Sequence, residues 1–193
     1  MQTQLSHTSA IRPTKERHWS IYVTVVLLVA VVAGIVALAS RGDGLDVIRN
    51  STATFKDVGA ATSAGYERFV DVDGIACIDM PRQGAMGVHY VNSALVGDGE
   101  IDVEHPEAML YEPGDGERLT LVGVEYVVLR AAWDAQHADP PELFETQFDV
   151  TASPNRFGLP DFYSLHVWAW RDNPAGLFAM WNPQVTCQSD RSD

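Results

Sequence analysis

The chain has 193 residues and a formal net charge of −13 at pH 7, with 26 acidic against 13 basic residues. A surface of this charge repels phosphate groups, which argues against nucleic acid and anionic lipid headgroups as binding partners. The length suits one folded domain after an N-terminal segment, and no internal repeat divides the chain.

The first structural signal is an apolar run over residues 20–40, SIYVTVVLLVAVVAGIVALAS, which contains no charged residue and no proline. About 20 helical residues span the roughly 30 Å hydrocarbon core of a bilayer, so this run predicts one transmembrane helix. Arg12, Lys15 and Arg17 precede it. The positive-inside rule therefore predicts a cytoplasmic tail over residues 1–19 and a single-pass cell-membrane protein whose C-terminal domain lies outside.

A cleaved signal peptide is the alternative for the same run. Ala37-Leu38-Ala39 matches the small-x-small pattern of a cleavage site, but the run is longer than the about 7–15 residues of a signal-peptide core. An uncleaved signal-anchor is therefore favoured, and both alternatives place the rest of the chain outside the cytoplasm. We expect a linker over residues 41–54, a folded domain over residues 55–188 and a C-terminal tail over residues 189–193.

The folded domain is expected to begin with a short helix followed by two strands. Asp57 is a good N-cap for a helix of about two turns, and Gly65 is a natural C-terminal stop. Alternating apolar residues then predict a strand over residues 69–80, with a break at Asp73-Gly74, and another over residues 85–92.

Residues 95–106 are expected to form an acidic loop. Asp98, Glu100, Asp102 and Glu104 alternate there as in a calcium-binding loop. The segment nevertheless lacks the glycine at the sixth loop position and the glutamate at the twelfth that such a loop uses. A solvated acidic loop is therefore predicted instead of a calcium site.

The next elements are predicted to form a β-hairpin. Residues 107–112 and the valine-rich residues 119–129 are expected to be strands, and PGDG at residues 113–116 is a strong turn signal. Residues 119–129 are apolar on both faces, which is typical of a central strand.

The last part of the chain alternates loops with an aromatic strand. A short helix is expected over residues 131–138, a loop over residues 140–161, a strand over residues 162–170 and a helical turn at Asn173-Pro174. The predicted fold class is thus α+β: one transmembrane helix, followed by a mainly antiparallel β domain of about five strands with a few short helices.

Cys77 and Cys187 are the two cysteines of the chain. In an oxidising compartment an isolated pair most simply forms a disulfide, and this one would close a loop of about 110 residues. Metal ligation or a reactive thiol is the alternative, but no CxxC spacing or nearby histidine favours it.

Three segments of the domain carry a resemblance to other sequences. MGVHYVNSALV (86–96), LVGVEYVV (121–128) and LHVWAWRDNPAGLFAMWNPQVTC (165–187) are similar to segments of a group of uncharacterised exported bacterial proteins. These share HYVN, a VEY strand and an HVWxW…NPxGxFxxWNPxVxC ending. The resemblance covers residues 55–187 and implies one domain and an external location, without an attached activity.

Four polar residues interrupt otherwise apolar strands: His89, Glu112, Glu125 and His166. An ionised carboxylate in such a strand must be paired, protonated or bound to a cation. Two imidazoles with one or two carboxylates are a reasonable ligand set for zinc, manganese, iron or copper. We therefore predict a buried cluster of His89, Glu125 and His166, with Glu112 as a further candidate ligand. A purely structural network of the same side chains is the alternative.

Other candidates are weaker. Trp168, Trp170 and Trp181 are candidates to line a ligand pocket, although residues at this spacing more often belong to a core. Ser164 lies near His166 but in no GxSxG elbow, so a catalytic nucleophile is not indicated. His105 and His137 lie in polar segments, where exposure is expected.

Two functions remain open at this point. The first is a membrane-anchored extracytoplasmic domain with a non-catalytic binding or envelope-associated role, whose small-molecule or protein partner the sequence does not identify. The second is a metal-binding protein or metal-dependent enzyme that uses a divalent metal ion as its cofactor. No catalytic motif decides between an enzyme and a binding protein.

Overall fold

A computed structural model of the chain describes residue 26, residues 42–116 and residues 118–187. The chain divides into two units, Met1–Arg41 and Gly42–Asp193, and the second is the β domain described below.

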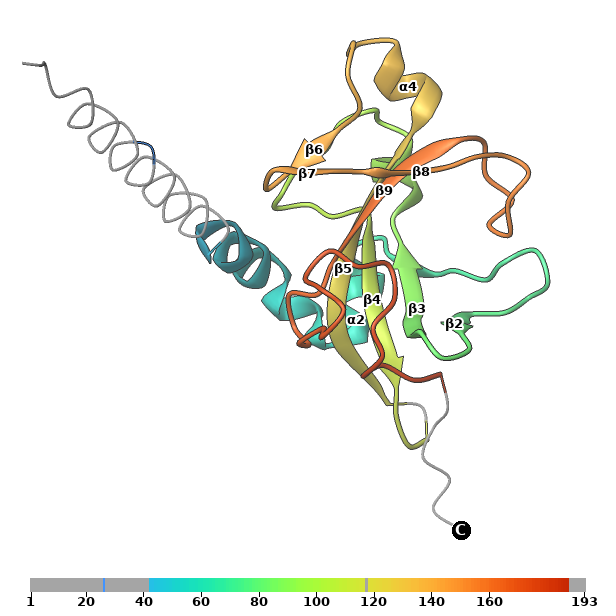
Figure 1. The fold of residues 1–193 in the computed structure, drawn as a ribbon. Coiled ribbons are helices and arrows are strands. Elements are labelled where there is room, and N and C mark those ends of the chain that lie inside the picture. The colour runs from blue at the N-terminus through green and yellow to red at the C-terminus, as the bar shows by residue number, and fades with distance from the viewer. Residues whose placement is uncertain (1–25, 27–41, 117, 188–193) are drawn as a thin grey trace, which may run out of the picture. The chain divides into compact units, whose positions relative to one another are not determined.

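The domain is built on a seven-stranded antiparallel sheet (Figure 1). Its strands are β1 (Glu67–Arg68), β2 (Cys77–Met80), β3 (Gly84–Val91), β4 (Ala108–Pro113), β5 (Leu119–Leu129), β8 (Asp149–Thr151) and β9 (Phe162–Val167). They lie in the order β1-β3-β4-β5-β9-β8, and β2 also pairs with β3. A second, two-stranded sheet joins β6 (Glu142–Leu143) to β7 (Thr146–Gln147).

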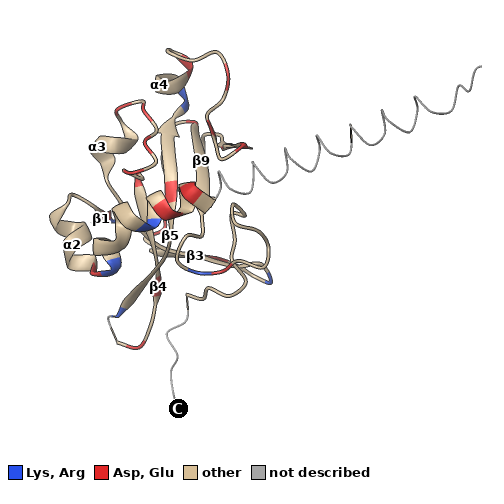
Figure 2. Ribbon diagram, turned by 90° about the vertical axis from the view of Figure 1, so that its left-hand side faces the viewer, with Lys and Arg blue, Asp and Glu red and all other residues tan. Residues whose placement is uncertain are grey.

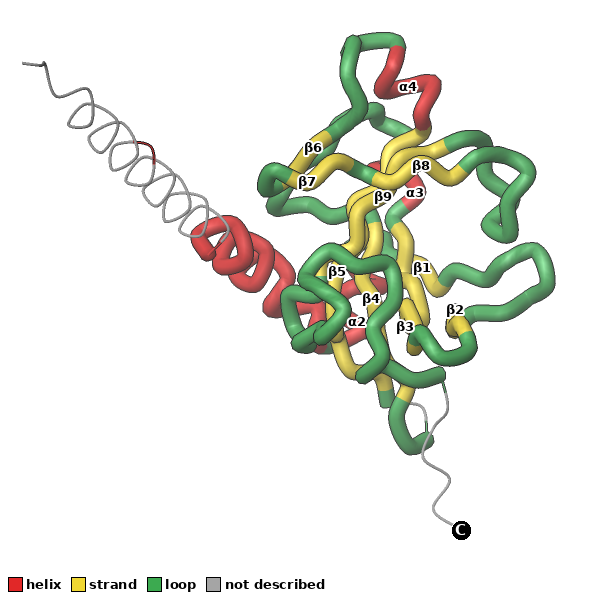
Figure 3. The backbone as a smooth tube through the Cα atoms, in the orientation of Figure 1, coloured by secondary structure: helices red, strands yellow, loops and turns green. Residues whose placement is uncertain are grey.

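Helices are short and connect or cover the strands (Figure 3). They are the helical residues 42–52, the 3-10 helix η1 (Ala53–Lys56), α2 (Val58–Ser63), α3 (Ser93–Val96) and α4 (Arg130–Asp134). The predicted N-cap of α2 is confirmed, because the Asp57 side chain accepts a hydrogen bond from the Gly59 N–H at 2.9 Å. Gly65 follows the helix with φ of +92°, a conformation that glycine adopts at little cost.

The two faces of the sheet bury different side chains, because successive residues of a strand point to opposite sides. On one face Met109, Val124 and Tyr126 join the main hydrophobic core, together with Ile48 of the helical residues 42–52 and Ala61 of α2. The opposite face carries the polar residues of the β3, β5 and β9 strands. The main core therefore packs against one face of the sheet, and the candidate site lies on the other face.

The fold class predicted from the sequence is correct for the antiparallel β domain with few short helices and wrong for the transmembrane helix. No helix in the described part of the chain is long and apolar enough to cross a membrane. The helical residues 42–52 carry the charged side chains of Asp43, Asp46 and Arg49, and the other described helices have four to six residues. The run 20–40, apart from residue 26, lies outside the described residues.

The predicted linker over residues 41–54 differs from the structure, because residues 42–52 are helical and belong to the domain. Ile48 is fully buried in the main core. Arg49 donates from Nε to the carbonyl of Ala169 at 2.8 Å, and the Trp170 indole donates to the Thr52 hydroxyl at 3.1 Å. These partners lie more than 100 residues away in sequence, so the local pattern of the segment does not show them.

Of the predicted strand over residues 69–80, only β2 (Cys77–Met80) is a strand, and β1 (Glu67–Arg68) lies before it. Between them the Asp71 carboxylate accepts hydrogen bonds from the backbone N–H groups of Asp73 and Ile75 and pairs with Arg156. A carboxylate that satisfies local backbone donors stabilises a turn in competition with strand pairing.

The predicted disulfide between Cys77 and Cys187 is confirmed, with a Cα–Cα distance of 5.5 Å. It ties β2 to the segment that follows β9. Ala85 of β3 and the fully buried Asn182 exchange two backbone hydrogen bonds of 3.1 Å. The C-terminal part of the described chain is thereby fastened over the polar face of the sheet.

Figure 2 shows acidic segments in loops, helices and strands of the domain.

Candidate metal centre

The register of the sheet brings three of the predicted site residues to one face. Glu125 of β5 lies directly opposite His166 of β9 and opposite Ala108 of β4. His89 of β3 lies opposite Leu110, two residues farther along β4. Alternation therefore directs all three polar side chains to the same side. Ala108 lies on β4, between the strands of His89 and Glu125. Its small side chain leaves room for the His89 imidazole to reach across β4 towards Glu125.

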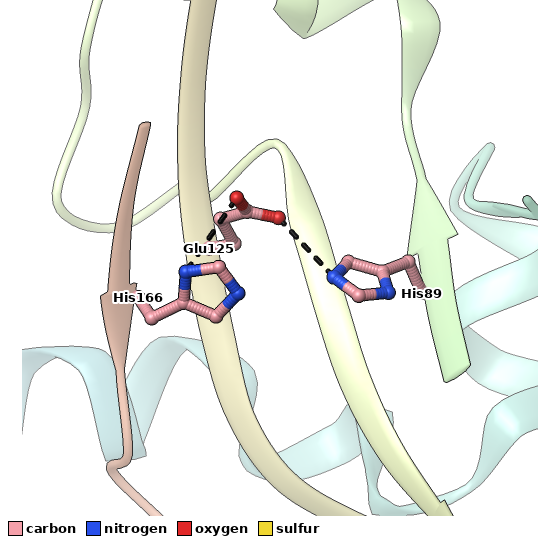
Figure 4. A group of neighbouring side chains, drawn as sticks. All are labelled: His89, Glu125 and His166. Carbon is pink, nitrogen blue, oxygen red and sulfur yellow. Dashed lines mark ion pairs between the residues drawn. The ribbon is translucent and has the colours of Figure 1, made fainter. Parts of the chain in front are cut away.

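These three side chains meet in a buried group (Figure 4). The Nε2 atom of His89 lies 3.4 Å from Oε2 of Glu125, and Nδ1 of His166 lies 3.6 Å from Oε1. The residues are only 4, 8 and 4% exposed in chain order. One ligand atom of each lies within 4.8 Å of the others. Zinc bonds to nitrogen and oxygen measure about 2.0–2.2 Å, so a small inward movement of the rings would let one ion contact all three.

Two imidazole nitrogens of the group have no hydrogen-bond partner. They are Nδ1 of His89 and Nε2 of His166, and both are buried. In Figure 4 the second nitrogen of His166, which is Nε2, faces the gap between its own ring and that of His89. A buried polar atom without a partner is destabilising by about 1–3 kcal/mol. A metal ion in that gap would satisfy this nitrogen and would contact the Glu125 carboxylate at the same time.

The charge states of the group suit metal coordination. Burial raises the pKa of Glu125, but the positive charges that His166 and His89 gain in acid, together with hydrogen bonds from His89 and Ser164, outweigh burial and lower it to about 2. Burial lowers the pKa of His166. At neutral pH an ionised carboxylate therefore faces a neutral imidazole, and both are the protonation states that bind a metal ion.

Glu112, the fourth candidate ligand, lies outside this group. Its carboxylate pairs with Arg171 and accepts a hydrogen bond from the backbone N–H of Thr186 at 3.1 Å. Glu112 is opposite Thr120, at the far end of the β4–β5 hairpin from Glu125. It joins β4 to the C-terminal segment, which is a structural role.

The three tryptophans of the predicted pocket lie in different settings. Trp168 is 2% exposed and packs with Leu110 and Val185 in a second core, where its ring stacks on His166 at a centroid distance of 6.3 Å. Trp170 packs against the main core and lies under the Lys56 ammonium group. Of the three, Trp181 lines a cavity beside His166.

The remaining sequence candidates behave as surface or supporting residues. His105 pairs with Asp102 at 2.8 Å on the exposed acidic loop, and His137 stacks on Trp133 at 3.7 Å between ring centroids. Ser164 is 4% exposed, and its side chain helps to lower the pKa of the Glu125 carboxyl. It therefore supports the ionised state of the buried group.

Two cavities adjoin the buried group. The larger, of about 400 Å³, reaches His89 and Glu125 and is otherwise lined mainly by apolar side chains. The smaller, of about 230 Å³, reaches Glu125 and His166 and is lined by several methionines and Trp181. Glu125 belongs to both, so the group lies where the two cavities meet.

Glu107 is a buried acid that the sequence analysis did not single out. It is 2% exposed, and its Oε2 accepts a hydrogen bond from the backbone N–H of Val127 at 2.9 Å. Burial raises its pKa to about 8. Glu107 directly follows the acidic loop, and an acidic residue beside other acidic residues is expected to be exposed. Its burial was therefore not predicted.

Replacing Glu107 with glutamine is expected to remove a pH dependence of stability. The folded state holds a proton that the unfolded chain releases above its usual pKa of 4.5, so the free energy of unfolding falls between about pH 4.5 and pH 8. We expect this fall to be on the order of 5 kcal/mol in the wild type and to be absent in Glu107→Gln. Urea denaturation at pH 5, 7 and 9 measures it. The exposed Glu142→Gln variant is the control and should retain the fall; an equal fall in Glu107→Gln would contradict the assignment.

Comparisons with protein-family models, with curated proteins and with solved structures find no match for this chain. The functional assignment therefore depends on the geometry of the domain. The resemblance of three segments to exported bacterial proteins stays a prediction.

Proposed function

We propose that the protein binds one divalent transition-metal ion through Nε2 of His89, the carboxylate of Glu125 and Nε2 of His166. The main support is the buried Nε2 of His166, which has no hydrogen-bond partner and faces the space beside Glu125 and His89. A purely structural network leaves this nitrogen without a partner, whereas a bound ion would satisfy it.

Zinc is the first candidate for this ion. A set of two imidazoles and one carboxylate suits zinc, and it also suits iron(II). The Cys77–Cys187 disulfide supports the predicted location outside the cytoplasm, since such bonds persist in oxidising compartments. Zinc has no redox chemistry and remains bound under those conditions, whereas iron(II) is readily oxidised.

The proposed centre resembles a ligand-binding zinc site more than a structural one. Structural zinc sites are closed by four protein ligands, whereas three ligands leave a position for water or another molecule. Apart from the three ligands, the ionisable residues that line the two cavities are Glu67, Arg68 and Arg156. Glu67 is exposed on the short β1 strand, and Arg156 is paired with Asp71. These positions favour binding of a small molecule over hydrolysis.

The proposal is tested by the zinc content of the purified full-length protein. Equilibrium dialysis should give one zinc per chain, and Glu125→Gln should weaken the affinity by about 100-fold or more, since it removes an anionic ligand. Glu112→Gln is the matched control, because it changes a carboxylate of the neighbouring strand that lies outside the group. Absence of zinc from the wild type, or equal losses in both variants, would overturn the proposal.

A further inference from the structure

The larger cavity is lined mainly by apolar side chains, in contrast to the polar buried group that it adjoins. Its walls come from residues 67–69, from the β3 and β5 strands, from α3 and from residues 157–162, and they are mainly apolar, with Glu67 and Arg68 as charged side chains besides Glu125. Representative side chains are Val91, Val96, Leu129, Phe157 and Leu159. A volume of about 400 Å³ lies in the range of small-molecule sites, and apolar walls favour an apolar ligand body.

The charge of the buried group determines which polar head such a ligand carries. A divalent ion held by one carboxylate and two neutral imidazoles, which are the forms that coordinate a metal, has a net charge of +1 together with its ligands. Charge interactions are strong in a buried site because the local dielectric constant is low. The metal-bound centre therefore prefers an anionic head.

We infer that the protein binds a small aliphatic or aromatic carboxylate, whose apolar body fills the larger cavity and whose carboxylate occupies the open position of the metal ion. This inference rests on the proposed metal site. It selects the larger cavity because His89 and Glu125 lie among its mainly apolar walls, whereas the smaller cavity has little more than half the volume.

Isothermal titration of the zinc-loaded, full-length protein with acetate, hexanoate and octanoate tests the inference. Each added methylene should raise the affinity about fourfold, which corresponds to about 0.8 kcal/mol per buried methylene. Octylamine should bind more weakly than octanoate by at least tenfold. After the zinc is removed with a chelator, the preference for octanoate over octylamine should be lost, because the positive charge of the ion is gone.

Two variants locate the binding cavity. Leu159→Trp, in a loop that lines the larger cavity, should reduce octanoate affinity at least tenfold while zinc remains bound one to one. Met80→Trp, at a partly exposed position of the smaller cavity, is the control and should leave both affinities unchanged. If Leu159→Trp loses its zinc, Val91→Trp on the opposite wall replaces it.

The outcomes separate this inference from the proposal on which it depends. A wild type without zinc overturns both. A wild type that binds zinc but shows no dependence of affinity on chain length, or no preference for octanoate over octylamine, overturns the inference alone. A loss of octanoate binding in Met80→Trp that equals the loss in Leu159→Trp also overturns it, because it contradicts the choice of cavity.

Discussion

Reduction of the Cys77–Cys187 disulfide is expected to lower the free energy of unfolding by about 4–5 kcal/mol. The bond joins residues 110 positions apart, and in the loop-entropy model a cross-link over about this length restricts the unfolded chain by that amount. A small domain is stable by only about 5–15 kcal/mol, so this loss removes a large part of its stability. Urea denaturation with and without reductant measures the change.

The double variant Cys77→Ser/Cys187→Ser is the control for this experiment. It should be destabilised to the same extent as the reduced wild type and should not respond to reductant. Alkylation of the native protein without reductant should label neither cysteine. Labelling of both thiols would show that the bond is absent. An unfolding curve that reductant leaves unchanged would show that the bond does not stabilise the domain.

The structure also predicts where the reduced protein loosens first. The disulfide fastens the C-terminal segment, in which Asn182 bonds to Ala85 and Val185 packs with Trp168 in the second core. Trp168 in turn stacks on His166. Backbone hydrogen exchange should therefore increase in residues 182–187 before it increases in the β4–β5 hairpin.

Replacing His166 with alanine is expected to abolish zinc binding at micromolar concentrations. The change removes a neutral, buried nitrogen ligand and leaves only His89 and Glu125, which is fewer ligands than the zinc sites of proteins ordinarily have. Competition with a chromophoric zinc chelator at pH 7 measures the affinity, which should fall by more than about 100-fold.

His105→Ala provides the control, because His105 is exposed and pairs only with Asp102 on the acidic loop. It should bind zinc as the wild type does. Circular dichroism and an intact disulfide would establish that His166→Ala is folded. If the wild type contains no zinc and His166→Ala loses only stability, the group is a structural network in which the removed ring left Glu125 without a partner.

Part of the fold follows from interactions between residues that are close in sequence. Asp57 at the start of α2 and the 113–116 turn between β4 and β5 act within a few residues, so their patterns predict the helix and the hairpin directly. The disulfide could also be predicted without the tertiary structure, since the chain has only two cysteines. The transmembrane prediction was also local, but no helix in the described part of the chain supports it.

The buried group was predicted in part because burial of a charge has a known cost. Glu125 lies between Val124 and Tyr126 in an apolar strand, so it required partners, and the two histidines in equally apolar strands were the candidates. The same reasoning added Glu112 to the predicted ligands, although its partner is Arg171, 59 residues away. It did not identify Glu107, a buried acid at the end of the acidic loop.

The sequence by itself therefore determined the longer strands β3, β4, β5 and β9, the cysteine pair and the types of residue that needed partners. Only the tertiary structure decided which partners meet, because the register of β3, β4, β5 and β9 sets which side chains share a row. A shift of one residue in any pairing would turn the strand's polar side chain to the opposite face. The burial of His89, Glu125 and His166 beside two cavities depends on that register, which arises from contacts throughout the sheet.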